Sequence, residues 1–312
     1  MKNKIKIESF VSQDTYSKLE EFEHNHGLTK AEIIRRSLAF WLYFIDNFFP
    51  LLGSVEKELS DINKILSLSN GNLQNFATEL FNIAKNTKQP FKSIQTIAQE
   101  FAKQGLSVED TLKRTKDALI LSQLSGMEVK ESVDIITSTL NSFNKETLNS
   151  TDIINKLAMI DANYSVSSND LAQALVRTGK TANDVGVSLD KLISVITTSQ
   201  QMTARGGEII GNSLKCIFQR LSNPDIRKQL QKIAPTINDS NSAIQNFEIL
   251  AIALKQVPEE EFSRIVSTMG FGIYQENLIK IILKDLSDKD SIYYKTVDML
   301  NNNLDRLNNK NK

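Results

Sequence analysis

Hydrophobic side chains recur at intervals of three and four residues along most of the chain, which is the spacing of one face of an α-helix. The clearest runs are Val129, Val133, Ile136, Leu140 and Phe143; Leu189, Leu192, Ile193, Val195, Ile196 and Met202; and Ile210, Leu214, Ile217, Phe218 and Leu221. Each run predicts an amphipathic helix. The sequence therefore predicts an all-α protein whose body consists of many such helices.

Polar residues mark where these helices begin and where the chain turns. Ser107, Ser167 and Thr29 each place a hydroxyl at an expected N-cap with an acidic residue three positions later, as in a capping box. The pair Gly206 and Gly207 separates two of the apolar runs. Because a glycine inside a helix costs about 1 kcal/mol relative to alanine, this pair predicts a turn at which two helices fold back on each other.

The first residues follow a different pattern, in which apolar and polar side chains alternate. Ile5, Ile7, Ser9 and Val11 would lie on one side and Lys4, Lys6, Glu8 and Phe10 on the other, which predicts a short strand. Two helical patterns follow, from about residue 14 to 25 and from about residue 30, separated by HGLT. This order of strand, helix, turn and helix resembles the ribbon-helix-helix family, in which two chains pair their strands into a ribbon that enters a DNA major groove.

That resemblance implies two sets of nucleic-acid contacts. Lys6, Glu8 and Phe10 would face the bases, and Lys4 is a further possible contact. Thr29 with Lys30 would lie at a helix N-terminus able to hold a phosphate. Residues 1–50 carry seven basic and seven acidic side chains and so have no net charge. Pairing of two chains without DNA is therefore as compatible with this unit as DNA reading.

Aromatic side chains crowd one segment of the second helical pattern. Six of the chain's aromatic residues (15 Phe, 6 Tyr and 1 Trp) are Phe40, Trp41, Tyr43, Phe44, Phe48 and Phe49. A helix that is apolar on nearly every side is either buried or docked on another surface. We expect burial, in an oligomer core or between the N-terminal unit and the helical body, ahead of contact with a membrane surface. A membrane span is not expected, because the apolar run is short and is interrupted by Asp46, Asn47 and Pro50.

Composition and candidate chemistry do not favour an enzyme. Lys and Arg number 37, as do Asp and Glu, so net charge does not draw the chain toward a polyanion. His24 and His26 lie beside Glu23, but ligands confined to one turn rarely close a metal site. The single cysteine, Cys216, is expected in the core, and no nucleophile is coupled to a base. We expect no catalytic residues, no cofactor and no metal.

Several longer blocks follow one another in a recognisable order. They are IAQEFAKQGLSVEDTLKRTKDALILSQLSGMEVKESVDIITSTLNSF, then VSSNDLAQALVRTGKTANDVGVSLDKLISVITTSQQMTARGGEIIGNSLKCIFQRL, and finally EEEFSRIVSTMGFGIYQENLIKIILKDL. In this order the blocks resemble the conserved helical domain of phage tail tape measure proteins. The resemblance implies a non-enzymatic structural protein that occupies the lumen of a growing tail, where tail-tube subunits polymerise around it with assembly chaperones.

Partners, location and domain limits follow from this resemblance. It implies tail-tube and tail-assembly proteins as partners, together with the chain itself as a homo-oligomer, in the host cytoplasm during assembly and then in the virion tail. A wholly helical chain of 312 residues would span only about 470 Å, which favours an assembly role over a length ruler. The expected parts are a strand-helix-helix unit over 1–50, a linker helix over 51–69, the tape-measure-like domain over 70–300 and a polar tail over 301–312.

Two other functions stay open from the sequence. One is a DNA-binding transcriptional regulator that uses the ribbon-helix-helix-like unit. The other is a scaffold of a non-phage complex that has borrowed the helical domain, in the cytoplasm or in an organellar stroma.

Overall fold

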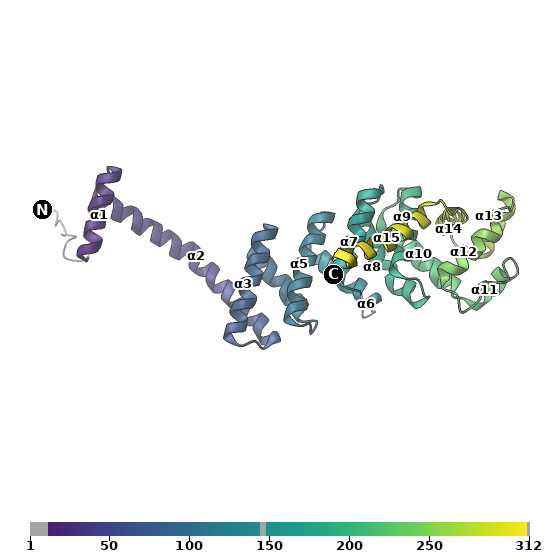
Figure 1. The fold of residues 1–312 in the computed structure, drawn as a ribbon, viewed down its shortest axis with the longest axis horizontal. Helices are drawn as coiled ribbons and strands as arrows, with labels where there is room; N and C mark the ends of the chain where they lie inside the picture. The colour runs from purple at the N-terminus through teal and green to yellow at the C-terminus, as the bar shows by residue number, and fades with distance from the viewer. Residues whose placement is uncertain (1–11, 144–147, 311–312) are drawn as a thin grey trace. The chain divides into compact units, whose positions relative to one another are not determined.

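The computed structural model describes residues 12–143 and 148–310, and these residues contain helices α1 to α15 and no strand (Figure 1). This confirms the prediction of an all-α protein. Contacts divide the chain into two compact units, which we call the N-terminal unit, up to residue 77, and the helical body, from residue 78.

The N-terminal unit consists of α1 (Gln13–His26), α2 (Lys30–Leu66) and the first part of α3 (Asn70–Thr87). The turn between α1 and α2 contains Gly27 in the left-handed conformation, with φ of 63°. The side chain of Thr29 caps α2 by accepting a hydrogen bond from the backbone N–H of Glu32 at 3.3 Å. Two helices therefore lie where the sequence predicts them, and α2 is continuous across residue 50. The predicted strand, with Lys4 and Lys6, lies outside the described residues.

The helical body continues α3 and adds twelve helices, which end in the described range at residue 310. Their bounds are α4 (Phe91–Ala102), α5 (Val108–Ser125), α6 (Val129–Ser142), α7 (Ser150–Asn163), α8 (Ser168–Asp184), α9 (Leu189–Thr203), α10 (Gly207–Leu221), α11 (Pro224–Gln231), α12 (Ala243–Leu254), α13 (Glu259–Thr268), α14 (Ile273–Leu286) and α15 (Ile292–Lys310).

Hydroxyl caps begin several of these helices, as the sequence predicts. Ser107 accepts the backbone N–H of Asp110 at 3.0 Å, and Ser167 accepts that of Asp170 at 3.1 Å. The acidic partner differs from a full capping box, because each aspartate accepts a hydrogen bond from the serine hydroxyl itself, at 2.8 Å and 2.7 Å.

The core of the helical body is built around α9. This helix packs against α8, α10, α14 and α15, and its side chains are buried without a break from residue 192 to 200. The sequence predicts one apolar face here, but neighbours on all sides bury the polar face as well. Ser194, Thr197 and Ser199 satisfy their hydroxyls by donating to the backbone carbonyl four residues earlier, at 2.7–2.8 Å, which is the local solution for a buried Ser or Thr.

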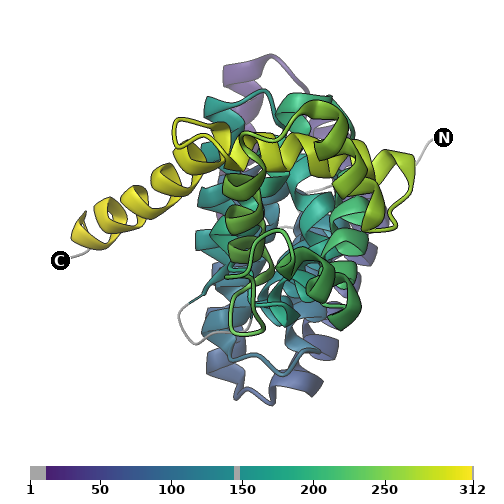
Figure 2. The same cartoon turned by 90° about the vertical axis from the view of Figure 1, so that its right-hand side faces the viewer.

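The last helix closes the body on itself. α15 follows α14 and packs against α9 and, over a smaller contact, α7, whereas the end of this helix extends away from the others (Figures 1 and 2). The backbone N–H groups of Ile292 and Tyr293, at the start of α15, donate to the carboxylate of Asp285 at 3.3 Å and 3.0 Å. Within the described residues, no helix has the combination of length and apolarity needed to cross a membrane.

Candidate interaction surfaces

The closest helix contact in the body joins α8 to α10. A Cβ added to Gly207 would lie 1.9 Å from the backbone oxygen of Asp170, and one added to Gly211 would lie 2.8 Å from the Cβ of Arg177. Both distances are shorter than non-bonded carbon and oxygen atoms tolerate. The two glycines, spaced four residues apart on one face of α10, therefore let its backbone rest directly on α8.

The predicted turn between α9 and α10 lies at residues 204–206, but its glycines act differently from the prediction. The left-handed residue of the turn is Ala204, with φ of 53°, whereas Gly206 is the N-cap of α10 with φ of −63°. Backbone conformation thus does not require the glycine pair. Gly207 is required by the contact with α8, a cause that only the tertiary structure reveals.

Asp170 ties the starts of α8 and α10 together. One oxygen of its carboxylate accepts the Ser167 hydroxyl at 2.7 Å, and the other accepts the backbone N–H of Gly207 at 2.8 Å. A carboxylate at a helix N-terminus is stabilised by the helix dipole, and here one carboxylate serves two N-termini. An ion pair between Arg177 and Glu208 lies one to two turns further along the same contact.

Carboxylates join other pairs of helices as well. Buried Asp117 of α5 accepts the hydroxyls of Ser150 and Thr151 at the start of α7, at 2.5 Å and 2.9 Å. Asp190, in the first turn of α9, pairs with the buried ammonium of Lys156 from α7. Together with Asp170, these groups join helices that do not follow one another directly in the chain, and the sequence alone did not reveal their partners.

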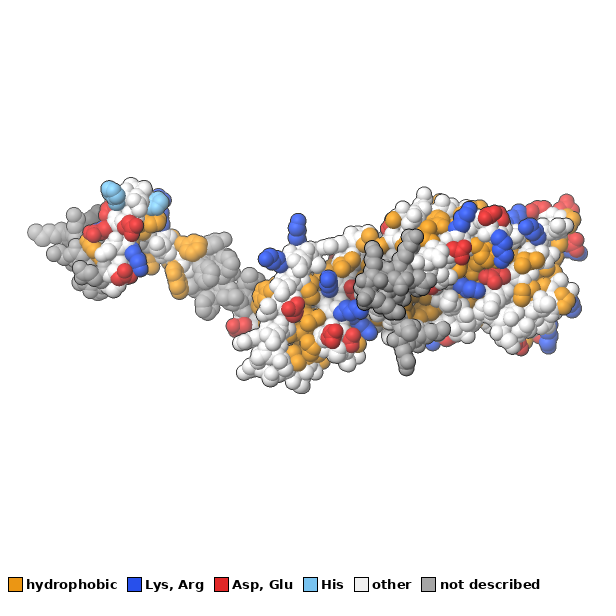
Figure 3. All heavy atoms as spheres, in the orientation of Figure 1, with side chains coloured by type: hydrophobic (Ala, Val, Ile, Leu, Met, Phe, Trp, Pro, Cys, Tyr) orange, Lys and Arg blue, Asp and Glu red, His pale blue; other side chains and the backbone are white. Residues whose placement is uncertain are grey.

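An exposed apolar group surrounds the turn between α9 and α10, and we call it the turn patch: Met202, Arg205, Ile273 and Tyr274. Ile273 and Tyr274 are 75 % and 71 % exposed. The guanidinium of Arg205 lies 5.6 Å from the centre of the Tyr274 ring. Met202 was expected on the buried face of α9 but is exposed, because it lies in the last turn, beyond the packed neighbours. On the face drawn in Figure 3, basic and acidic side chains are interspersed among the exposed hydrophobic ones.

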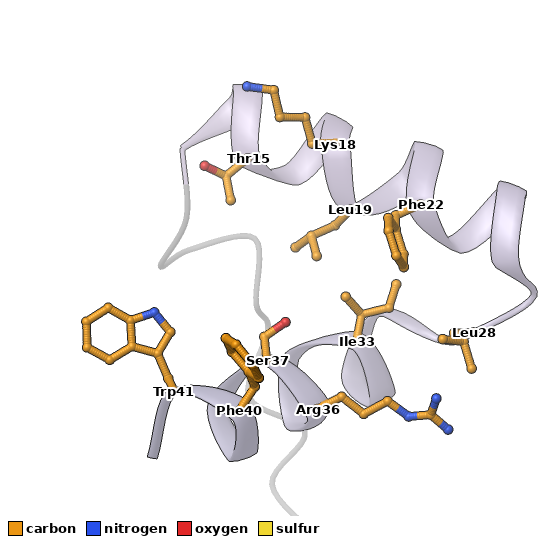
Figure 4. Close-up of a pocket in the computed structure, with 10 residues that line it drawn as sticks. All are labelled: Thr15, Lys18, Leu19, Phe22, Leu28, Ile33, Arg36, Ser37, Phe40 and Trp41. Carbon is orange, nitrogen blue, oxygen red and sulfur yellow. The ribbon is translucent and has the colours of Figure 1, made fainter. Parts of the chain in front are cut away.

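The N-terminal unit contains an open groove of about 760 Å³ between α1 and α2. Leu19 and Phe22 of α1 face Ile33 and Phe40 of α2 across it, with Trp41 at one end and Leu28 at the other (Figure 4). Its rim carries few polar side chains: Thr15, Lys18, Arg36 and Ser37. The groove is therefore a predominantly apolar surface on which a protein segment can pack.

The two described residues of the expected DNA contact set are engaged within the N-terminal unit. The Lys30 ammonium donates to Glu20 at 2.7 Å and to the Tyr16 hydroxyl at 2.9 Å. These hydrogen bonds raise the pKa of Lys30 above its ordinary value. Thr29 caps its own helix. Lys30 thus braces α1 against α2, and a phosphate would compete with Glu20 for it.

Two of the six clustered aromatic residues are described, and both are exposed in the single chain. Phe40 is 67 % and Trp41 61 % exposed. The side chains of Tyr43, Phe44, Phe48 and Phe49 lie outside the described residues. Burial of this cluster against a second molecule or against the helical body stays a prediction.

The remaining candidates are the histidines, as possible metal ligands, and the single cysteine. His26 stacks near Phe22, with ring centres 4.1 Å apart, and the described residues contain no group of three metal-ligating side chains. The expectation that Cys216 belongs to the core is wrong, since it is exposed. Leu214, Ile217 and Phe218 occupy the buried face of α10, and Cys216 lies on the opposite side.

Comparison with known proteins agrees with this architecture. Residues 73–272 match the family model described as phage-related minor tail protein. The match begins in α3 and ends immediately before α14, so it covers the α8–α10 contact. No solved structure matches the chain.

A tape measure protein from Pneumococcus phage Dp-1 is 20 % identical over 220 residues. The alignment covers 69 % of this chain and 19 % of that relative, so the chain spans a small part of its relative's length. The family model, in contrast, accounts for most of the chain, including the core around α9. The chain belongs to the phage-related minor tail protein family.

Proposed function

We propose that this protein acts in phage tail assembly as a non-enzymatic, tape-measure-like structural protein. The observation that carries the proposal is the family match over residues 73–272, which coincides with a helical body packed around α9. The proposed location is the host cytoplasm during assembly and then the virion tail. The proposed partners are tail-tube and tail-assembly proteins, together with further copies of the chain.

The helical body is the part that we assign to tail partners. Hydrogen bonds and ion pairs of buried and half-buried carboxylates hold its helices together. A surface that is already ordered in this way loses little conformational entropy on binding. The turn patch is the most exposed apolar group near the α8–α10 contact, and its Arg205 and Tyr274 are residue types enriched at protein interfaces. We therefore place a partner contact at this patch. The division into a pairing unit over 1–50, a linker over 51–69 and a tape-measure-like domain over 70–300 belongs to the same proposal.

Affinity purification of the tagged chain from phage-producing cells, followed by mass spectrometry, tests the proposal. We expect recovery with tail-tube or tail-assembly proteins, in a nuclease-insensitive manner. Ile273→Asp should reduce that recovery, because it places a charge in the turn patch. Ile252→Asp, at another exposed isoleucine of the body, is the matched control and should leave recovery unchanged.

Two other results would replace the proposal with one of the alternatives. Nuclease-sensitive recovery with DNA, weakened by salt, would indicate a regulator that uses the ribbon-helix-helix-like unit. Recovery in a stable complex without any phage protein would indicate a scaffold that has borrowed the helical domain.

A further inference from the structure

The described side chains of α1 and of the first part of α2, up to residue 42, form no buried core. Among the described side chains from residue 12 to 61, none is buried, and Ile62 is the first that is. Isolated helices gain most of their stability from packing an apolar face. The pair α1 and α2 nevertheless exposes large apolar side chains, so a stable form of this region requires a surface that covers them.

The exposed side chains form both a groove and a ridge. The groove between α1 and α2 is lined by Leu19, Phe22 and Ile33. Trp41, at one end of the groove, and its helix neighbours Leu38 and Leu42 are 59–61 % exposed, and we call these three side chains the ridge. A surface that contains a concave and a convex apolar part side by side is self-complementary under a two-fold axis.

The charges of α1 and of the first part of α2 favour a partner surface without a strong net charge. Residues 12–42 carry four basic and five acidic side chains, and the basic groups pair within the unit. Lys18 binds Asp14, Lys30 binds Glu20, and both Arg35 and Arg36 bind Glu32, at 2.5–2.9 Å. A polyanion or an anionic membrane would find no excess of positive charge here. A second copy, which has the same net charge of only −1 over these residues and the same apolar surface, meets little electrostatic repulsion.

The exposed area is sufficient for a pairwise contact. Phe22, Leu38, Phe40, Trp41 and Leu42 are each 47–67 % exposed, which corresponds to about 100 Å² for a large side chain. Burying this set on two copies removes about 1,000 Å² from water, which reaches the lower range of specific protein interfaces.

We propose that α1 and the first part of α2 form a self-association surface, in which the ridge of each copy packs into the groove of a second copy. The occupant is thus the same region of another chain, related by a two-fold axis. This inference rests on the part of the proposed function that expects a homo-oligomer, and it adds the surface and its partner.

Trp41 provides a direct test, because it is the only tryptophan of the chain. We expect the full-length protein to show a blue shift of tryptophan emission as its concentration rises, in step with a monomer-to-dimer transition in sedimentation velocity. Because the contact is apolar, added salt should not weaken it. A wild-type protein that stays monomeric up to about 100 µM, or that forms trimers or larger species only, would overturn the proposal.

Matched variants separate this surface from the rest of the chain. Leu42→Glu should raise the dimer dissociation constant at least tenfold, whereas Ile252→Glu, an equally exposed position on α12, should leave it unchanged. Both should keep the circular dichroism of the helical body, which excludes unfolding as the cause. Equal effects of the two variants would contradict the assigned surface.

Disulfide trapping tests the packing of ridge into groove. In a Cys216→Ser background, a tagged chain with Leu19→Cys is mixed with an untagged chain with Leu42→Cys. We expect oxidation to yield a cross-linked heterodimer, and a Leu42→Cys chain mixed with an Ile252→Cys chain should yield none. The absence of the first cross-link in a proven dimer would overturn the ridge-into-groove arrangement.

The outcomes distinguish this inference from the proposed function. A chain that is monomeric but is still recovered with tail proteins would refute self-association and leave the tail role intact. A dimer that is recovered without any tail protein would do the reverse. If monomeric chain instead inserts Trp41 into lipid vesicles, the surface belongs to a membrane and the proposal fails.

Discussion

In the helical body, α9 is buried without a break from residue 192 to 200, whereas α1 contains no buried residue among its described side chains. Carboxylates of the body, such as those of Asp117 and Asp170, also accept hydrogen bonds from helices more than 30 residues further along the chain. The described ion pairs of α1 and α2 connect only neighbouring turns or the two helices of that hairpin. The core around α9 is therefore packed within a single chain, and for α1 and α2 we propose that a second copy covers the exposed apolar side chains.

The largest expected effect is on the α8–α10 contact. Gly207→Ala should lower the free energy of unfolding of the body by about 3 kcal/mol, because its Cβ has no room against the Asp170 backbone. Chemical denaturation followed by circular dichroism measures this loss. At Gly206, where the nearest atom to an added Cβ is 3.8 Å away, Gly206→Ser should cost less than about 0.5 kcal/mol. Similar losses at both positions would show that the contact is looser than described.

A smaller effect isolates the carboxylate that serves two helices. Asp110 and Asp170 both follow a serine cap by three residues, but only Asp170 also accepts the N–H of another helix. Asp170→Ala should therefore destabilise the body by about 1 kcal/mol more than Asp110→Ala does. Denaturation midpoints of the two variants measure the difference. Equal losses would mean that the bond to Gly207 contributes nothing to stability.

The pH dependence of stability offers a further test of the body. Burial, together with the nearby Glu248 carboxylate, raises the pKa of Tyr293 above its ordinary value of 10.0. Above about pH 10 the unfolded chain loses this proton and the folded chain keeps it, so stability falls by about 1.4 kcal/mol per pH unit from this group. Tyr293→Phe should remove that part of the slope between pH 10 and 11. An unchanged slope would show that folding does not raise the pKa of Tyr293.

The smallest effect concerns the brace between α1 and α2. Lys30→Met removes the hydrogen bonds to Glu20 and Tyr16, and we expect amide exchange in α1 to accelerate a few fold with no change in α9. Hydrogen exchange with mass spectrometry measures both helices in one sample. Slower exchange in α1 at high protein concentration would support its cover by a second copy. Equal protection of α1 and α9 in dilute solution would show that α1 is stable without such cover.

Sequence patterns located most of the helices but misplaced several side chains. Val133, Ile136 and Leu140 of α6 and Phe143 at its C-cap are buried as their spacing predicts. The serines at 107 and 167 cap their helices as predicted. Cys216 and Met202 are exposed against expectation. Periodicity gives the faces of a helix, but it does not give the number of neighbours that cover those faces.

By itself, the sequence determined the helical class, the starts of the capped helices and the resemblance to tail proteins, because these depend on residues close together in the chain. Only the tertiary structure decided that Gly207 must be glycine and that Asp170 joins two helices, since both depend on α8 and α10 lying backbone against backbone. It also showed that Phe40 and Trp41 are 67 % and 61 % exposed in the single chain. An apolar side chain is buried only where another surface is close enough to exclude water from it.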